Sequence, residues 1–197
     1  HRRKGNYDTS LECHNRGYAL ASDIGNSKET IININNLGET YLEMGQFEKA
    51  IEKYQEAMLA SKGADDIQQE CHAARGIAKA YVEMGQAEKA LEFARLSLKI
   101  TRDTKNPGEE WRARYVLAGA YRINRDYELA ESEFENCIDI LKQAGTDKID
   151  PTINFERALL YLDMGKEKEA EEELLAARSE FEEKGYATTV KRIDDLL

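Results

Sequence analysis

The sequence lacks most of the features that mark secreted or membrane-spanning proteins. It contains three cysteines and two prolines in 197 residues, and no Asn-x-Ser/Thr glycosylation acceptor. No apolar run approaches the roughly 18 to 20 residues that span a bilayer, and no apolar stretch follows the basic N-terminal residues as in a signal peptide. We therefore expect a cytoplasmic protein without a membrane partner.

Basic residues are too few for a typical nucleic-acid-binding protein. Lys and Arg number 28 against 38 Asp and Glu, which gives a formal net charge of -10. Binding to nucleic acid requires a concentration of basic residues that neutralises phosphates, and none is found along the chain. We expect no nucleic-acid partner.

The three cysteines, Cys13, Cys71 and Cys137, lie far apart and form no CxxC pair. Their spacing fits neither a disulfide framework nor a structural metal site. The sequence also has no phosphate-binding glycine loop and no His-Glu-x-x-His pattern. We predict no metal and no cofactor.

Helix-forming residues dominate the sequence. Ala, Glu, Leu and Lys are abundant, while β-branched residues are scattered and show no alternating strand pattern. The composition therefore predicts an all-α fold.

One segment recurs at a fixed offset of 40 residues, at 41–50, 81–90, 121–130 and 161–170. Every copy begins with Tyr and ends with Ala. Residues 5–11 match the second part of the next copy along, position by position. The sequence thus predicts a repeat array that opens in the middle of a repeat and is part of a longer protein.

Each repeat has the pattern of two helices joined by a tight turn. Gly45, Gly85 and Gly165 follow the first helix and suit a left-handed position after its C-terminus. In the third full repeat Asn124 and Arg125 replace Met-Gly, and Asn is tolerated in such a turn. We expect the turn to be retained there.

The 40-residue period exceeds the ordinary unit of about 34 residues. The surplus falls in turn-rich connectors at 61–66, 102–108 and 143–148, which can also hold an extra helical turn. The expected segments are the second helix of a truncated repeat at 1–26, repeats at 27–66, 67–106, 107–146 and 147–186, and a capping helix or the start of a further repeat at 187–197.

The repeat resembles the tetratricopeptide repeat in a 40-residue variant. The matching residues of the first full unit are Leu37, Gly38, Tyr41, Gly45, Phe47, Ala50, Tyr54 and Ala57. The resemblance implies a right-handed α-α superhelix, a solenoid of antiparallel helix pairs, in which the Ala and Tyr positions are core. It also implies a scaffold that binds a protein or peptide in its concave groove.

By this resemblance the first helix of each repeat lines the groove, at fixed positions counted from Ile31, Cys71, Trp111 and Pro151. The candidate partner-binding residues are Asn35, Glu39, His72, Arg75, Lys79, Arg112, Tyr115, Arg122, Phe155 and Leu159.

Charges at the groove positions cancel, although the whole chain carries -10. The charged positions are Arg75, Lys79, Arg112 and Arg122 against Glu39, Glu43, Glu83 and Asp163. One interpretation is a docking strip for an acidic or C-terminal peptide, with Tyr115 and Phe155 as apolar anchors. The alternative is that these charges are solvated or paired with one another inside the groove.

Some relatives by resemblance hold a C-terminal carboxylate with a clamp of Lys, Asn and Arg. Arg75 and Lys79 resemble one pair of that clamp. Glu39 stands where Asn would be needed, and its carboxylate would repel the group that the clamp receives.

The sequence favours an interaction scaffold in a larger protein over an enzyme. His14 and His72 have no Ser or Cys partner in a recognisable catalytic motif, so we interpret them as packing and surface histidines. Two alternatives remain open: a regulatory array that controls a linked ATPase, cyclase, kinase or DNA-binding domain, and a self-association module whose exposed repeat ends form a homodimer.

Overall fold

The computed structural model describes residues 6–104, 107–146 and 149–197. These residues form ten α-helices, and the described part contains no strand, as the composition predicted. The helices are α1 Tyr7–Asp23, α2 Ser27–Glu43, α3 Phe47–Gly63, α4 Ile67–Glu83, α5 Ala87–Thr104, α6 Pro107–Ile123, α7 Tyr127–Gln143, α8 Pro151–Asp163, α9 Glu167–Glu183 and α10 Ala187–Asp194.

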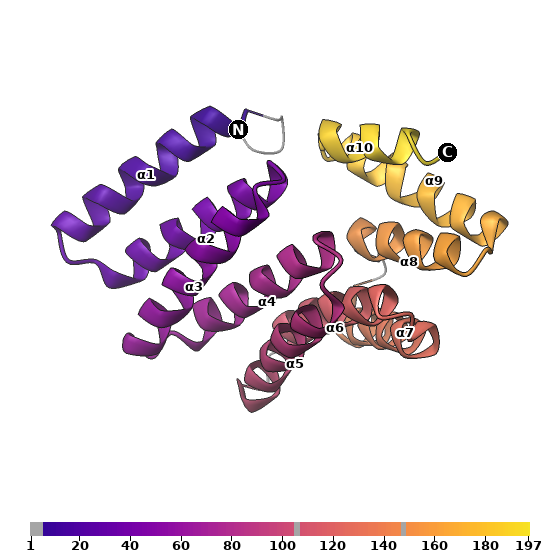
Figure 1. The fold of residues 1–197 in the computed structure, drawn as a ribbon, viewed down its shortest axis with the longest axis horizontal. Helices are drawn as coiled ribbons and strands as arrows, with labels where there is room; N and C mark the ends of the chain where they lie inside the picture. Colours follow the sequence, from indigo (N-terminus) through magenta and orange to yellow (C-terminus); the bar gives the residue numbers. More distant parts are fainter. Residues whose placement is uncertain (1–5, 105–106, 147–148) are drawn as a thin grey trace.

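Successive helices run antiparallel and follow one another around an arc (Figure 1). Each helix packs on the next along the chain, and α2, α4, α6 and α8 also contact one another as a row on the inner side of the arc. Helices α3, α5 and α7 lie outside this row. The predicted α-α superhelix is therefore confirmed, and its inner surface is built from the first helix of each repeat.

The turn inside each repeat has the geometry expected from its glycine. Gly45, Gly85 and Gly165 have φ of 72°, 69° and 72°, in the left-handed region. At the first of these turns the Gln46 N–H donates to the Tyr41 carbonyl at 2.9 Å, and the Gly45 N–H donates to the Leu42 carbonyl at 3.0 Å. These two bonds form a Schellman motif, which closes the helix within three residues.

The same turn also joins one repeat to the next. Gly25, Gly145 and Gly185 have positive φ, and Asp65 takes this position with φ 53°. Helices accordingly start at residues 7, 27, 47, 67, 87, 107 and 127, which are 20 residues apart. The surplus over an ordinary repeat therefore lies in helices of 17 or 18 residues, and only short turns remain of the predicted connectors. Parts of two of these connectors, at 105–106 and 147–148, lie outside the described residues.

The third turn is retained, but a different residue carries its strain. Arg125, and not Asn124, takes the left-handed position, with φ 66°. Asn124 stays in place as the last helical neighbour, and its side-chain amide donates to Asp126 Oδ2 at 2.7 Å. The backbone register therefore fixes which residue is left-handed, even where that residue is not glycine.

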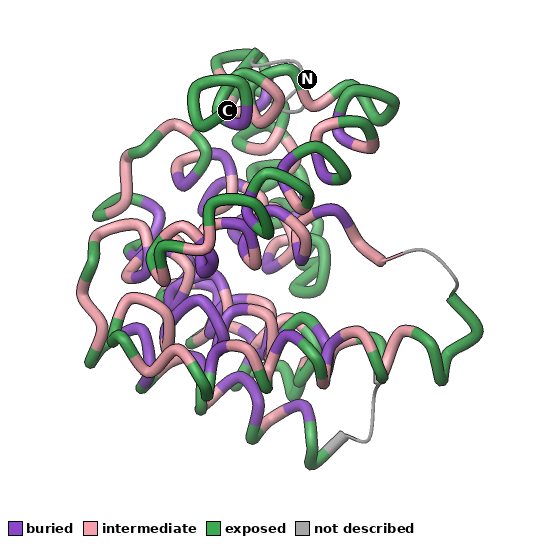
Figure 2. The backbone as a smooth tube through the Cα atoms, turned by 90° about the vertical axis from the view of Figure 1, so that its right-hand side faces the viewer, coloured by how far each residue is buried: buried purple, intermediate pink, exposed green. Residues whose placement is uncertain are grey.

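The core consists of small residues where helices approach closely and large side chains between repeats. Ala50, Ala90, Ala130 and Ala170 have no exposed surface, as their predicted core role requires. Buried segments lie along the contacts between helices, and exposed ones lie at the turns and outer faces (Figure 2). The fully buried Tyr54 fills the space between the first and second full repeats, where it meets two glycines.

Helix α8 departs from the regular spacing because it begins at Pro151. Asp150 caps the helix, since its Oδ1 accepts hydrogen bonds from the backbone N–H of Thr152 at 3.0 Å and from the Thr152 hydroxyl at 2.6 Å. Proline suits the first helical position because its missing N–H would be unpaired there. The shortened α8 packs less extensively on α7 and α6 than the earlier first helices pack on their neighbours.

Candidate interaction groove and its central pocket

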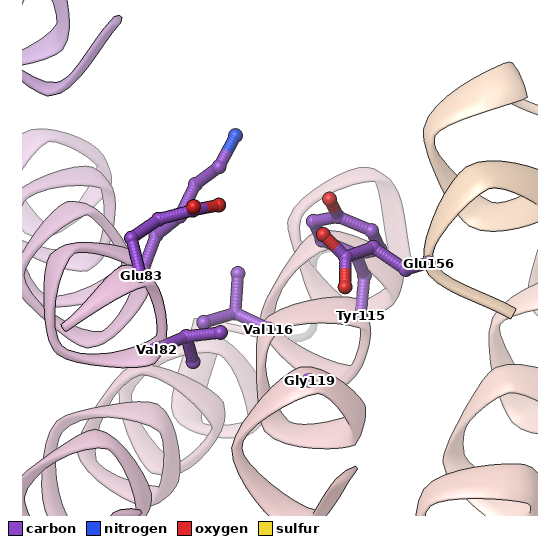
Figure 3. A pocket seen from close by; sticks show the side chains of 7 residues that line it. Val82, Glu83, Tyr115, Val116, Gly119 and Glu156 are labelled. Atoms are coloured by element: carbon purple, nitrogen blue, oxygen red, sulfur yellow. The ribbon is translucent and has the colours of Figure 1, made fainter. Parts of the chain in front are cut away.

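A pocket opens at the centre of the inner surface, where α4, α6 and α8 converge (Figure 3). It encloses about 230 Å³, part of which is open solvent. Two of the predicted groove residues, Lys79 and Tyr115, line it. The complete lining is Lys79, Val82, Glu83, Tyr115, Val116, Gly119 and Glu156.

The pocket exists because one repeat has glycine where the others carry a larger side chain. Gly119 occupies the repeat position held elsewhere by Glu39, Lys79 and Leu159. A Cβ added at Gly119 would lie 3.8 Å from Glu156 Oε2 and from Val82, so the space above it is open. This signal was present in the sequence, but a count of polar groove residues overlooks a glycine.

Glu156 is a buried carboxyl group with an unsatisfied oxygen. Its residue is 6% exposed, and its Oε2 accepts no hydrogen bond within the described part of the chain. Arg122 Nη2 lies 3.6 Å away, within ion-pair range but beyond hydrogen-bond distance. Burial raises the pKa of Glu156, and Glu83 adds to this, while Arg122, Lys79 and Arg192 act against it.

Tyr115 and Glu156 lie beside one another in the pocket, and Glu83 lies across from them on α4 (Figure 3). Burial raises the pKa of Tyr115 well above its ordinary value, and the negative charges of Glu156, Glu83 and Asp150 raise it further. The Tyr115 hydroxyl is therefore neutral, and it faces mainly acidic neighbours.

The basic groove residues Arg75 and Arg112 meet at an acidic neighbour. Arg75 Nη1 lies 2.6 Å from Glu109 Oε2, and Arg112 Nη1 lies 3.4 Å from the other oxygen of Glu109. Arg112 also stacks over the ring of Trp111, 4.7 Å from its centroid. These contacts join the second and third full repeats.

Arg122 joins the third repeat to the fourth. Its Nη1 donates to Asp163 Oδ2 at 2.8 Å, and its side chain is 14% exposed. Its Nε is buried and finds no acceptor among the described residues. Pairing inside the groove, the alternative left open by the sequence, thus describes both Arg75 and Arg122.

Two predicted groove residues are buried instead of facing the open groove. Asn35 is 1% exposed, and its Nδ2 donates to the backbone and side-chain oxygens of Gln69 at 3.3 and 2.9 Å. Phe155 is 6% exposed, and the guanidinium of Arg192 lies 5.2 Å from its ring centroid. Both residues hold helices together, Asn35 between α2 and α4 and Phe155 between α8 and α10.

The other predicted residues are partly exposed on the inner helices. Glu39 lies on α2 and Leu159 on α8, and His72 on α4 lies beside the buried Tyr54, with 6.3 Å between ring centroids. Lys79 has no ion pair within the described part of the chain. The structure thus gathers Lys79, Tyr115 and Arg122 around one point and leaves the rest spread along the groove.

Glu156 and Arg192 belong to this site but were not predicted from the sequence. Glu156 occupies the repeat position of the buried Gly76 and Val116, and a carboxyl group in a buried register was the available signal. Arg192 Nη2 lies 3.5 Å from Glu83 Oε2, so α10 reaches α4 across the groove. The separation of these residues in the chain leaves no local pattern.

Within residues 6–104, 107–146 and 149–197, no group of three His, Cys, Asp or Glu side chains is placed to hold a metal ion. None of the described helices is long and apolar enough to cross a membrane.

Family profiles described as Tetratricopeptide repeat match residues 1–62, and again residues 76–104 and 112–140. Together with the helix pairs and their fixed period, these matches show that the chain belongs to the tetratricopeptide repeat superfamily. No curated protein matches the chain in sequence. Membership in this superfamily supports a protein-interaction scaffold as the general role.

Solved structures of similar fold include several repeat proteins. BtubC (BKLC) from P. vanneervenii is 18% identical, with a TM-score of 0.68 over 88% of this chain and 73% of that chain. A putative kinesin light chain from Podospora anserina with nearly identical TPR-like repeats is 20% identical, with a TM-score of 0.62 over 90% of this chain and 88% of that one. A Rap protein complexed with Competence and Sporulation Factor is 17% identical, with a TM-score of 0.77, and this chain spans 53% of its length. At these identities the likeness concerns the fold.

Proposed function

We propose that the inner surface formed by α2, α4, α6 and α8 binds a segment of a partner protein. The observation that carries this proposal is the central pocket, in which three repeats present polar groups to one point and Glu156 Oε2 lacks a hydrogen-bond donor. Buried polar groups normally have partners, and an unmet one at the floor of an open site is suited to a ligand group.

The charges of the groove shape this proposal. Arg75 and Arg122 are held in ion pairs between repeats, so their role is to fix the curvature of the array. Lys79 and Arg112, whose side chain is 44% exposed, are the basic groups available to a partner. An acidic or C-terminal segment, as expected from the sequence, would lie beside these two residues.

Selection from a displayed library of random peptides tests the groove directly. We expect selected peptides to lose at least ten-fold in affinity for the Lys79→Glu and Arg112→Glu variants, because both changes reverse charge on the inner surface. Lys99→Glu and Arg102→Glu on α5 make the same change at exposed positions outside the inner row and serve as controls. Equal losses in all four variants, or none in either groove variant, would contradict the proposal.

Self-association is a second candidate, carried by exposed apolar residues on α1. Tyr18, Leu20 and Ile24 are 36%, 63% and 76% exposed. Apolar side chains gathered on one helix are suited to a second copy of the chain. Light scattering on the protein and on a Leu20→Glu, Ile24→Glu variant checks this: the proposal requires a dimer that the variant abolishes, and a monomeric parent protein would refute it.

A further inference from the structure

We infer that the central pocket is a subsite for the ammonium group of a lysine side chain from the partner segment. This inference rests on the proposed function, since it names the group that the inner surface selects. It concerns Glu83, Tyr115 and Glu156, which sequence patterns did not identify together.

The pocket offers hydrogen-bond acceptors and lacks a donor to meet one of them. Glu156 Oε2 is buried and accepts no hydrogen bond in the described structure, and the Tyr115 hydroxyl lies beside it (Figure 3). Glu83 faces them from α4, where Arg192 approaches it at 3.5 Å. An ammonium group has three donors and no acceptor, so it complements such a set of oxygens.

The walls of the pocket suit the stem of a lysine side chain. Val82 and Val116 supply apolar surface on α4 and α6, and the missing side chain of Gly119 leaves the entrance open. Long basic side chains bury their methylene groups on such surfaces while the charged end is held elsewhere. A volume of about 230 Å³, some of it open solvent, fits one side chain and falls below that of typical sites for whole small molecules, roughly 300 to 1,000 Å³.

The local charge favours a cation over an anion. The cations near the pocket are already engaged: Arg122 with Asp163 at 2.8 Å, and Arg192 with Glu83 and the Phe155 ring. Lys79 is partly exposed and free to move toward solvent. A carboxylate bound here would instead lie against Glu156, whose raised pKa reports an environment already unfavourable to negative charge.

Small probes test the subsite without a partner. We would titrate the protein with n-butylammonium, n-butyrate and n-butanol and follow the backbone amide resonances of α4, α6 and α8 by NMR. The amine is expected to shift the resonances around Gly119 and to bind Glu156→Gln at least ten-fold more weakly. Glu133→Gln, which alters a carboxylate paired with Arg114 on α7, is the matched control and should bind as the parent does.

Stronger shifts with butyrate or butanol, or equal affinity of the amine for the parent and Glu156→Gln, would overturn the subsite. A Gly119→Leu variant adds a second measurement, because its side chain fills the pocket while the carboxyl group remains. Amine binding that survives this change would also overturn the inference.

Selected peptides separate this inference from the proposed function. Replacing the lysine of a selected peptide by norleucine removes the charge and keeps the length, and we expect at least a ten-fold loss with the parent protein and little loss with Glu156→Gln. Peptides that bind the groove without such a lysine would refute the subsite and leave the proposed function standing. Amine binding at the pocket, without any peptide that senses Lys79 or Arg112, would support the subsite and refute groove binding.

Discussion

Two junctions between repeats use glycine for opposite purposes. Between α2, α3 and α4 the ring of Tyr54 lies where the side chains of Gly38 and Gly76 would be, with ring carbons 3.0 Å and 2.5 Å from the Cβ positions. Between α4, α6 and α8 the nearest atoms to the Cβ position of Gly119 are 3.8 Å away. The same residue type therefore permits dense packing at one junction and leaves a pocket at the other. Only the second junction leaves space for a ligand.

The largest expected effect comes from emptying the dense junction. Tyr54 is 1% exposed, and Tyr54→Ala should lower the free energy of unfolding by about 3 to 5 kcal/mol, because a large aromatic side chain leaves a cavity that the helices cannot close. Urea denaturation followed by circular dichroism measures this change. A loss below about 1 kcal/mol, well under the usual range, would mean that the ring is not the centre of this junction.

A smaller loss should follow from overfilling the same junction. Gly76→Ala places a methyl group against the Tyr54 ring and should cost about 1 to 3 kcal/mol through overpacking. In a Tyr54→Ala background the added methyl should instead be harmless, so a double-mutant cycle isolates the contact. Equal effects in both backgrounds would place the cost in the helix backbone.

The open junction should respond in the opposite direction. Gly119→Ala adds a methyl group at ordinary contact distance and removes a flexible glycine from a helix interior, so it should stabilise by about 0.5 to 1 kcal/mol. Thermal unfolding compared with Gly76→Ala measures the contrast. A destabilised Gly119→Ala protein would show that the junction is closed in solution.

The last prediction concerns the buried carboxyl group of the open junction and its pH dependence. Because the pKa of Glu156 is raised in the folded protein, its contribution to stability is complete below the ordinary Glu pKa of about 4.3 and declines as pH rises through the folded pKa. Glu156→Gln has no such proton to lose, so its stability relative to the parent should rise with pH over this interval. Urea unfolding at a series of pH values, with Glu133→Gln as control, measures the difference.

The repeat pattern predicts the fold closely because the fold depends on local rules. Buried Ala50 and left-handed Gly45 follow from spacing and from the conformational freedom of glycine. The pocket does not follow from such rules, since it forms where side chains from three repeats meet. Pairs such as Arg75 with Glu109 and Arg122 with Asp163 lie 34 and 41 residues apart. A residue list taken one repeat at a time counts these cations as available when each already has a partner.

The identical closed turns make the array resemble a spring. A three-residue Schellman turn has no slack, so the length of the array changes only when neighbouring helices rotate against each other. Such rotation is easiest where packing is lightest, and α8 packs lightly on α6 and α7. Stretching or winding the superhelix would therefore open or close the pocket beside Gly119, so a ligand held there would stiffen the whole coil.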